Sequence, residues 1–291
     1  MKFSIIIPNW NGKSLLEKNL PAVLETTADE VIVVDNGSTD GSVAWLKKTK
    51  QQKAILRVVE LEKNYGFGYA CNLGAGQAKG EIVVLLNNDV VPEKDFLTPL
   101  GEDFQDQKVF AVSLGELQWS WAKGGWVGGF IEHRPGPKTK TPHLSFWASG
   151  GSGAFRKNLW KKLGGFDEIY RPFFWEDLDL SYRAWKRGYK IIWDPRAVVH
   201  HCHGQTVSRF PQNYVRLISQ RNQLVFIWKN ITSSKMFFEH FVFLLKRLFV
   251  QPKSWRQFLA AMIKLPKVLP KRIKEIKEGS ISDEEVFRLF C

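Results

Sequence analysis

Cysteine is scarce in this 291-residue sequence. Cys71, Cys202 and Cys291 have neither the close spacing of a metal finger nor an evident pairing. A disulfide framework is therefore not expected, and a reducing compartment such as the cytoplasm is favoured. Long uncharged runs are also lacking, so no membrane-spanning helix is expected. The first apolar run, Phe3–Pro8, is too short for a signal peptide and is typical of a strand. We therefore expect a protein that is soluble or bound to a membrane surface.

Two common nucleotide-binding loops are missing as well. Neither a Walker-type glycine-lysine loop nor Gly-x-Gly-x-x-Gly follows the first predicted strand, where residues 9–13 are Asn-Trp-Asn-Gly-Lys. This argues against phosphoryl transfer from ATP and against dinucleotide binding. The same loop is a poor match to the glycine-rich basic loop of a sugar nucleotidyltransferase, which stays as a disfavoured alternative.

Positive charge exceeds negative charge, with 42 Lys and Arg against 29 Asp and Glu and a net charge of +13. Nucleic acid, an anionic membrane surface and phosphorylated substrates all fit this balance. The excess is concentrated in residues 235–291, where phenylalanines and leucines recur at helical spacing among lysines and arginines. This pattern predicts a basic amphipathic helical tail on an anionic membrane. The alternative is a tail that packs on the rest of the chain and leaves its charges in solvent.

Apolar runs alternate with helical patterns through the first hundred residues. The predicted strands are Phe3–Pro8, Glu30–Asp35, Ile55–Glu60 and the run that ends at Leu86. The last is typical of a strand that is buried on both faces of a parallel sheet. The pattern predicts an α/β fold with a doubly wound, mostly parallel sheet. We divide the chain into a domain at 1–234, with halves at 1–115 and 116–234, and the tail at 235–291. Pro92 predicts a helix that begins at Glu93.

Polar side chains follow two of these strands. Asn87–Asp89 ends the fourth strand, and Asp35 with Asn36 ends the second. The carboxyl ends of parallel strands meet at one edge, which is where open α/β sheets bind ligands. A carboxylate such as Asp89 can hold a divalent cation, and Asp35 can accept hydrogen bonds from a ribose or a base. A simple turn or a helix cap would place the same residues there, so neither loop decides alone.

Six motifs resemble those of family 2 glycosyltransferases of GT-A fold. They are Ile-Ile-Ile-Pro-Asn-Trp-Asn-Gly at 5–12, Val-Asp-Asn-Gly-Ser-Thr-Asp-Gly-Ser at 34–42, Asn-x-Gly-Phe-Gly-x-Ala-x-Asn at 64–72, Leu-Asn-Asn-Asp at 86–89, Gly-Gly-Phe-Asp-Glu at 164–168 and Trp-Glu-Asp-Leu-Asp-Leu-x-x-Arg at 175–183. Each motif is weak, but their order and spacing over residues 3 to 206 make a strong combined signal. The nearest subgroup is the rhamnosyltransferase-like enzymes that build cell-surface polysaccharides.

The resemblance implies a donor site for a UDP-, dTDP- or GDP-linked sugar in the half at 1–115. Its residues would be Pro8, Asn9, Asp35, Asn36, Asn72 and Asn88. Asp89 would bind the Mg²⁺ or Mn²⁺ ion that bridges the donor diphosphate. The usual pattern at that point is Asp-x-Asp, whereas residues 87–89 are Asn-Asn-Asp. The missing first carboxylate leaves the strictness of the metal requirement open.

The half at 116–234 would carry the acceptor and the catalytic base. The resemblance implies that Asp177 takes the proton of the acceptor hydroxyl during inverting, in-line displacement. Glu176 could substitute in that role, and both acids could instead only complement the start of a helix. Among His200, His201 and His203, the last two best fit a His-x-His pattern on one face of an extended segment and are candidate metal or phosphate ligands.

Tryptophans of the same half are candidate platforms for acceptor sugars. Trp119, Trp121 and Trp126 lie in a glycine-rich stretch, and Trp175 directly precedes the acidic pair. Such residues more often fill a core. Together these features predict an inverting, metal-assisted glycosyltransferase that acts on a lipid-linked or cell-surface glycan, peripheral on the cytoplasmic face of the membrane. A non-catalytic nucleic-acid-binding module is disfavoured, because acids at 35, 89 and 177 would repel a phosphate chain.

Overall fold

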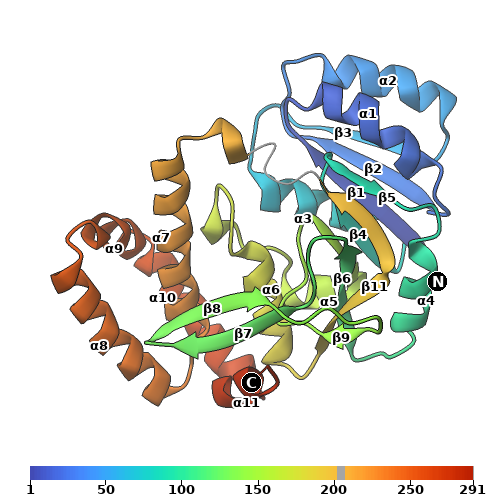
Figure 1. Ribbon diagram of the computed structural model, residues 1–291. Helices are drawn as coiled ribbons and strands as arrows, with labels where there is room; N and C mark the ends of the chain where they lie inside the picture. Colours follow the sequence, from blue (N-terminus) through green and yellow to red (C-terminus); the bar gives the residue numbers. More distant parts are fainter. Residues whose placement is uncertain (202–206, 291) are drawn as a thin grey trace.

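The computed structural model describes residues 1–201 and 207–290 and has a mixed α/β architecture (Figure 1). Its strands are β1 (Phe3–Asn9), β2 (Glu30–Asp35), β3 (Leu56–Glu60), β4 (Ile82–Leu86), β5 (Val90–Pro92), β6 (Val109–Glu116), β7 (Ala122–Val127), β8 (Phe130–Pro135), β9 (His143–Leu144), β10 (Ser152–Arg156) and β11 (Lys190–His201). Its α-helices are α1 (Lys13–Leu24), α2 (Ser42–Gln52), α3 (Phe67–Gln77), α4 (Leu97–Asp103), α5 (Lys157–Leu163), α6 (Glu176–Trp185), α7 (Gln212–Asn230), α8 (Ser234–Val250), α9 (Ser254–Met262), α10 (Leu265–Glu278) and α11 (Asp283–Arg288).

One nine-stranded sheet organises the molecule, in the order β3-β2-β1-β4-β10-β6-β11-β5, with β9 paired to β11. Strands β1 to β4 pair in parallel, and so do β6 and β11. Strand β10 runs antiparallel between β4 and β6, and β5 is antiparallel to β11. Strands β7 and β8 form a separate hairpin. The predicted α/β fold with a mostly parallel sheet is confirmed.

The central strands are apolar throughout because they are covered on both faces. Successive side chains of a strand point to opposite faces. On β1, Ile5 and Ile7 share a core with Leu16 of α1, whereas Ile6 packs with Ala70 of α3 on the other side. The same alternation on β4 places Val84 in one core and Val83 in the other. Two apolar layers thus hold the sheet rigid, and its carboxyl edge stays available for polar loops.

The segment after Asp89 differs from the prediction. No helix begins at Glu93 in the described chain, because Val90–Pro92 forms β5 and pairs with the end of β11, with His201 opposite Val90. Helix α4 begins at Leu97. The short strand matters for the site, since its register brings the last residue of β11 beside Asp89.

The last helices gather on the side of the molecule away from β1–β3 (Figure 1). Helix α7 packs against α9 and α10. Asp283, at the start of α11, forms an ion pair with Lys186 at 2.8 Å and accepts a hydrogen bond from the Tyr182 hydroxyl at 2.6 Å. The helices of residues 235–291 are therefore anchored to the sheet domain at several points. None of the described helices has the length and apolar character that crossing a bilayer requires.

Candidate functional site

A cleft of about 380 Å³ lies at the carboxyl edge of the sheet. Its walls come from the ends of β1 and β4, the loop before β10 and the start of α6. These segments are distant in the sequence, but parallel pairing brings the strand ends to one edge, as at a switch point of an open α/β sheet. Residues predicted as donor, metal and base ligands meet here: Pro8, Asn9, Asn36, Asn88, Asp89, Glu176, Asp177 and His201 all line the cleft.

A chain of amide and carboxylate contacts fixes the donor side of the cleft. Asn9 and Asp35 are register partners on β1 and β2. The Nδ2 atom of Asn9 donates to Asp35 Oδ2 at 2.9 Å, and Asn88 Nδ2 donates to Asn9 Oδ1 at 2.8 Å. Asp35 is fully buried, and its other oxygen accepts the Ser38 N–H at 2.9 Å. Asp35 therefore lies beneath the cleft and orients the two amides that line it.

Two further predicted donor residues organise loops. Asn36 accepts the Tyr65 N–H at 2.8 Å and donates to Asn64 Oδ1 at 2.9 Å, so it holds the loop before α3 against the cleft that it lines. Asn72 is not among the cleft-lining residues of the described chain. Its amide donates to the Phe166 carbonyl and accepts the Phe166 N–H, both at 2.8 Å. A donor-binding role for Asn72 stays a prediction, while its contacts show that it joins α3 to the Gly-Gly-Phe-Asp-Glu segment.

His201 lies between two carboxylates. Its Nε2 atom is 3.2 Å from Asp89 Oδ1, and its Nδ1 atom is 3.0 Å from Glu116 Oε1. Burial alone would lower the pKa of His201, but the contacts with Asp89 and Glu116 outweigh it and raise that pKa to about 9. The imidazole is thus an imidazolium at neutral pH and occupies the place of a cation at the end of β4.

A divalent cation suits this position chemically. Asp89 offers carboxylate oxygens, and His201 offers a ring nitrogen once its proton is displaced. Within residues 1–201 and 207–290, no group of three or more His, Cys, Asp and Glu side chains could hold a metal ion. A cation here would therefore need diphosphate oxygens and water as its other ligands. His203 lies outside the described residues, and His200 is exposed and contacts Glu93 at 2.6 Å.

Glu116 and the loop before β10 were not predicted as parts of the site. Glu116 ends β6 and accepts the Ser152 hydroxyl at 2.5 Å as well as contacting His201. Asn87 N–H donates to the Gly151 carbonyl at 2.8 Å, which ties that loop to β4. Because β10 is inserted antiparallel between β4 and β6, no local sequence signal indicates these neighbours. Only the position of Glu116 at the end of an apolar run, Val109–Leu114, resembles that of Asp89.

The acidic pair stands at the start of α6, across the cleft from the strand ends. Asp177 Oδ2 accepts the Gly150 N–H at 3.1 Å, and Oδ1 accepts the Leu178 N–H at 2.8 Å. Burial raises the pKa of Asp177. Burial and the neighbouring charge of Asp177 raise the pKa of Glu176 to about 8. A buried Glu176 oxygen has no hydrogen-bond partner among the described atoms. Because the two carboxyls are neighbours, a charge on Asp177 disfavours a second charge on Glu176, and the pair holds a proton more tightly than two separate acids would.

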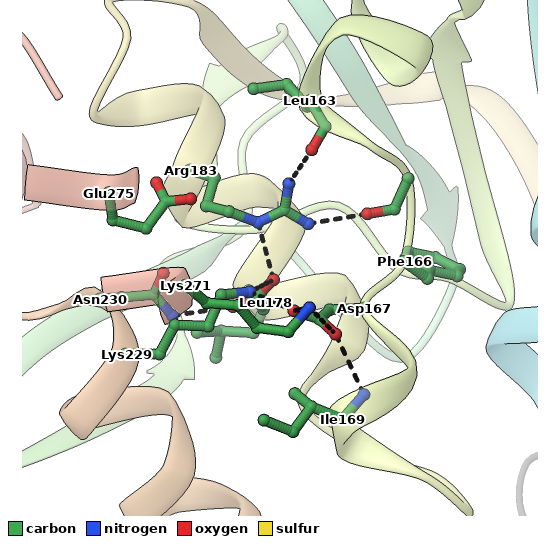
Figure 2. Close-up of polar contacts among 12 residues, drawn as sticks. Leu163, Phe166, Asp167, Ile169, Leu178, Arg183, Lys229, Asn230, Lys271 and Glu275 are labelled. Carbon is green, nitrogen blue, oxygen red and sulfur yellow. Dashed lines mark hydrogen bonds and ion pairs between the residues drawn. The ribbon is translucent and has the colours of Figure 1, made fainter. Parts of the chain in front are cut away.

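Asp179, two residues further along α6, belongs to a different cluster. It forms ion pairs with Arg183 and Lys229, and Lys229 also pairs with Asp167; Figure 2 labels Arg183, Lys229 and Asp167. Lys229 Nζ of α7 is 2.8 Å from both Asp179 Oδ1 and Asp167 Oδ2. Burial opposes ionisation of Asp179, but Lys229 and Arg183 outweigh it and lower its pKa. Arg183 also donates to the Gly165 carbonyl at 2.7 Å. The cluster joins α6, α7 and the Gly-Gly-Phe-Asp-Glu turn and thereby fixes where α6 begins.

The predicted acceptor tryptophans are dispersed. Trp119 is 49% exposed and lines a second cavity of about 300 Å³ beside the cleft. Trp126 donates to Glu239 Oε2 at 2.9 Å and packs 6.2 Å from the ring of Phe287. Trp175 packs 5.3 Å from the ring of Phe226. The acceptor roles of all three stay predictions.

Trp147 was not predicted, yet it lines both the cleft and the second cavity. Its buried indole N–H has no hydrogen-bond partner in the described part of the chain. A buried donor without a partner is rare in proteins and is a candidate contact for a ligand hydroxyl. Ser149 likewise lines both cavities, so the two cavities adjoin at these side chains.

Comparison with known sequences gives a consistent result. The family model "Glycosyl transferase family 2" matches residues 4–163. The O-antigen chain rhamnosyltransferase RfbN of Salmonella typhimurium is 25% identical over 227 residues, covering 74% of this chain and 70% of that protein. The chondroitin synthase of Pasteurella multocida is 26% identical over 223 residues, covering 64% of this chain but only 23% of that protein.

Solved structures show the same fold. The mannosyltransferase PcManGT of Pyrobaculum calidifontis, in complex with GDP-Man and Mn²⁺, has a TM-score of 0.60 and 19% identity, covering 95% of this chain and 84% of that one. The S. aureus TarS 1-349 structure has a TM-score of 0.59 and 20% identity, covering 94% and 82%. GalNAc-T7 with UDP, GalNAc and Mn²⁺ has a TM-score of 0.66 and 18% identity, covering 81% of this chain and 49% of that one.

Proposed function

Since the chain belongs to glycosyl transferase family 2, we propose that it transfers a hexosyl or deoxyhexosyl residue, with inversion, from a nucleotide sugar to a hydroxyl of a lipid-linked or cell-surface glycan. The observation that carries this proposal is that Asp89 and Asp177 line one cleft together with Asn9 and Asn88. The edge that we propose for the nucleotide and the carboxylate that we propose as the base thus face the same space, as displacement at a sugar carbon requires.

The donor would bind at the strand ends. Asn9 and Asn88 offer amide groups that are already oriented by Asp35, so little rotational freedom is lost when a ribose or a base binds. UDP-, dTDP- and GDP-linked sugars are all compatible with these neutral contacts. The similar structures hold UDP or GDP-Man with Mn²⁺, which supports a nucleoside diphosphate at this edge.

Mg²⁺ or Mn²⁺ would be held by Asp89 and His201, which lie 3.2 Å apart. When bound, the cation would neutralise the charge that develops on the leaving diphosphate. Glu116, on the other ring nitrogen of His201, would keep Nε2 directed at the cation, as carboxylates behind ligating histidines do. His201, at the end of β11, would thus provide a second ligand where residues 87–89 offer only the carboxylate of Asp89.

Asp177 would act as the general base. The acceptor hydroxyl gives its proton to the Asp177 carboxylate while its oxygen bonds to the anomeric carbon, and the bond from that carbon to the diphosphate oxygen breaks on the opposite side. Glu176, with its raised pKa, would stay protonated and leave the charge on Asp177. The Gly150 N–H holds Asp177 in place from the β10 loop.

The acceptor would approach through the second cavity. Trp147 and Ser149 line both spaces, and Trp119 provides an exposed ring on the outer side. Aromatic rings suit the apolar face of a sugar, and the Trp147 N–H suits one of its hydroxyls. The exposed apolar and basic residues of the last helices would keep the enzyme at the cytoplasmic face of an anionic membrane, close to a lipid-linked acceptor.

Product analysis tests the reaction class. The protein is incubated with Mn²⁺, a membrane glycolipid extract and a panel of UDP-, dTDP- and GDP-sugars, and the released nucleotide is identified. A glycosyltransferase releases a nucleoside diphosphate from one or a few donors. In parallel reactions that also contain inorganic pyrophosphate, conversion of a nucleotide sugar to a nucleoside triphosphate and a sugar 1-phosphate would instead indicate a sugar nucleotidyltransferase and would overturn the proposal. A thermal-shift screen of the same panel, with and without Mn²⁺, reports donor binding independently of the acceptor.

A further inference from the structure

Another surface cavity, larger than the cleft at the sheet edge, is formed by the last helices. A groove of about 880 Å³ is lined by residues of the first turns of α7 and of the connection from α8 to α9. Figure 1 shows these helices together on the side of the molecule away from β1–β3. Four cationic side chains line it: Arg216, Arg247, Lys253 and Arg256. We call this cavity the basic groove. Its residues come from three helices, so its charge is a property of the folded structure and not of one charged run.

The positive charge of the basic groove is not balanced by the protein. No Asp or Glu is among its described lining residues, and none of the four cations has an ion pair with a carboxylate in the described chain. Elsewhere the molecule pairs its buried cations, as Arg183 with Asp179 and Lys186 with Asp283 show. Arg247 is half-buried, and its contacts are the Ser254 hydroxyl at 3.4 Å and the face of Phe130 at 5.2 Å. Unpaired cations around a concave surface favour an anionic ligand.

Exposed apolar side chains flank the same cations along the chain. Phe249 is 88% exposed and Val250 69% at the end of α8, where they follow Arg247 after the buried Leu248 without lining the groove. On α9, Leu259 is 55% exposed, and Ile263, just beyond it, is 81% exposed. Exposed apolar residues of this size mark a binding surface. Next to unpaired cations, they suit an amphiphile with an anionic head and a hydrocarbon chain better than a nucleic acid or a free anion.

An aromatic wall connects the basic groove with the donor cleft. Tyr214 lines the groove, whereas Phe173 and Phe210 line the cleft. The ring of Phe210 lies 6.0 Å from that of Tyr214 and 5.4 Å from that of Phe173. The ring of Phe173 also lies 6.3 Å from that of Tyr214. A molecule with its head in the groove is thus one layer of side chains away from the catalytic space.

We propose that the basic groove binds the phosphate or diphosphate of a lipid-linked acceptor. The hydrocarbon chain would lie along the exposed apolar residues of α8 and α9, and the glycan would extend past the aromatic wall towards Asp177. Helix α9 begins at Ser254, a groove residue, so the positive end of its dipole adds to the attraction. This inference rests on the proposed glycosyl transfer, because it assigns the acceptor of that reaction.

Calorimetric titration with farnesyl diphosphate, without any nucleotide sugar, tests the groove directly. R216S/R256S should weaken binding at least tenfold, since two of the four groove cations are removed. K267S/K277S is the matched control, because it removes the same charge from exposed lysines of α10 that do not line the groove. An equal loss in the control pair would assign binding to diffuse charge and overturn the proposal. So would an unchanged dissociation constant in R216S/R256S, or no binding by the wild-type protein.

Two further arms separate the source of the phosphate. Inorganic pyrophosphate should bind at least tenfold more weakly than farnesyl diphosphate, because it has no chain for the apolar flank. Equal affinities would indicate a site for free anions and contradict a lipid ligand. Phosphatidylglycerol vesicles should bind R216S/R256S and K267S/K277S equally well. Weaker vesicle binding by R216S/R256S alone would indicate that the groove is a general site for anionic lipids and would contradict a site for the acceptor phosphate. D177N should bind farnesyl diphosphate as the wild type does, because Asp177 does not line the basic groove. The titration therefore reports on the groove even if the protein transfers no sugar.

Discussion

Asp177 and Asp179 lie two residues apart on α6, yet their surroundings are opposite. Asp179 is fully buried between Lys229 and Arg183, which lower its pKa. Asp177 lines the cleft, has backbone N–H groups as its partners, and has a raised pKa. The first arrangement stabilises a charge where it is, and the second keeps a carboxylate ready to accept a proton. One acidic motif thus stabilises the fold through Asp179 and, as we propose, provides the catalytic base through Asp177.

The sharpest test of this contrast is D177N. The change removes the base but keeps the shape of the side chain, so turnover should fall about 10³-fold, equivalent to about 4 kcal/mol. Donor affinity, measured by calorimetry with Mn²⁺, should stay within about threefold of the wild type. A variant that retains more than a tenth of wild-type turnover would show that Asp177 is not the base.

D179N makes the same Asp-to-Asn change in the buried ion-pair cluster. It leaves Lys229 and Arg183 without their buried partner, so the free energy of unfolding should fall by about 3 kcal/mol. Urea denaturation of D177N and D179N, side by side, measures the difference. Turnover per folded molecule of D179N should remain near that of the wild type at low temperature. If D177N loses as much stability as D179N, the division between fold and chemistry fails.

Glu176, which lines the cleft with Asp177, should make the stability of the protein depend on pH. Its pKa is raised to about 8 in the folded protein, from an ordinary value of 4.5. The folded state therefore holds this proton more tightly than the unfolded state, and the resulting stability is present below pH 4.5 and lost as pH rises through 8. E176Q removes this titration and should be more stable than the wild type at pH 8.5 by about 2 kcal/mol. Parallel stability profiles of both proteins between pH 5 and 9 would contradict this.

E116Q should have the smallest effect. Glu116 contacts His201 without lining the donor edge itself, so its loss should weaken apparent Mn²⁺ affinity about tenfold while the protein stays folded. E93Q is the matched control, because Glu93 contacts the exposed His200 of the same strand at 2.6 Å. Titrations of activity against Mn²⁺ in both variants decide the matter. If E116Q and E93Q show the same dependence of activity on Mn²⁺ concentration, Glu116 does not position His201 for the cation.

The sequence was informative where local pattern and chemistry coincide. The apolar runs of β1, β2 and β4 require burial on both faces, so the parallel sheet and the meeting of Asn36, Asn88 and Asp89 at one edge followed from the pattern alone. The family motifs then indicated Asp177 and His201, which line the same cleft.

Contacts set by long-range packing could not be predicted. Glu116 and Trp147 reach the site because β10 inserts antiparallel between β4 and β6, and no periodicity encodes that insertion. Lys229, one of the partners of Asp179, comes from α7, 50 residues away in the chain. The strand at Val90–Pro92 was missed because three residues carry too little pattern to outweigh a proline. Trp126 is a further case, because its ring contacts Phe287 of α11, and no residue near Trp126 in the sequence indicates that contact.

The central claim is that the metal and the base share one cleft, and paramagnetic relaxation tests it most directly. The ¹⁵N spectrum of the UDP complex is recorded with Mn²⁺ and with Mg²⁺ as the diamagnetic reference. Mn²⁺ should broaden the amide of Gly150, which donates to Asp177, and the amide of Gly151, whose carbonyl accepts the Asn87 N–H. The amide of Gly188, before the far end of β11, should stay sharp. A spectrum in which Gly150 is unaffected by bound Mn²⁺ would contradict the account.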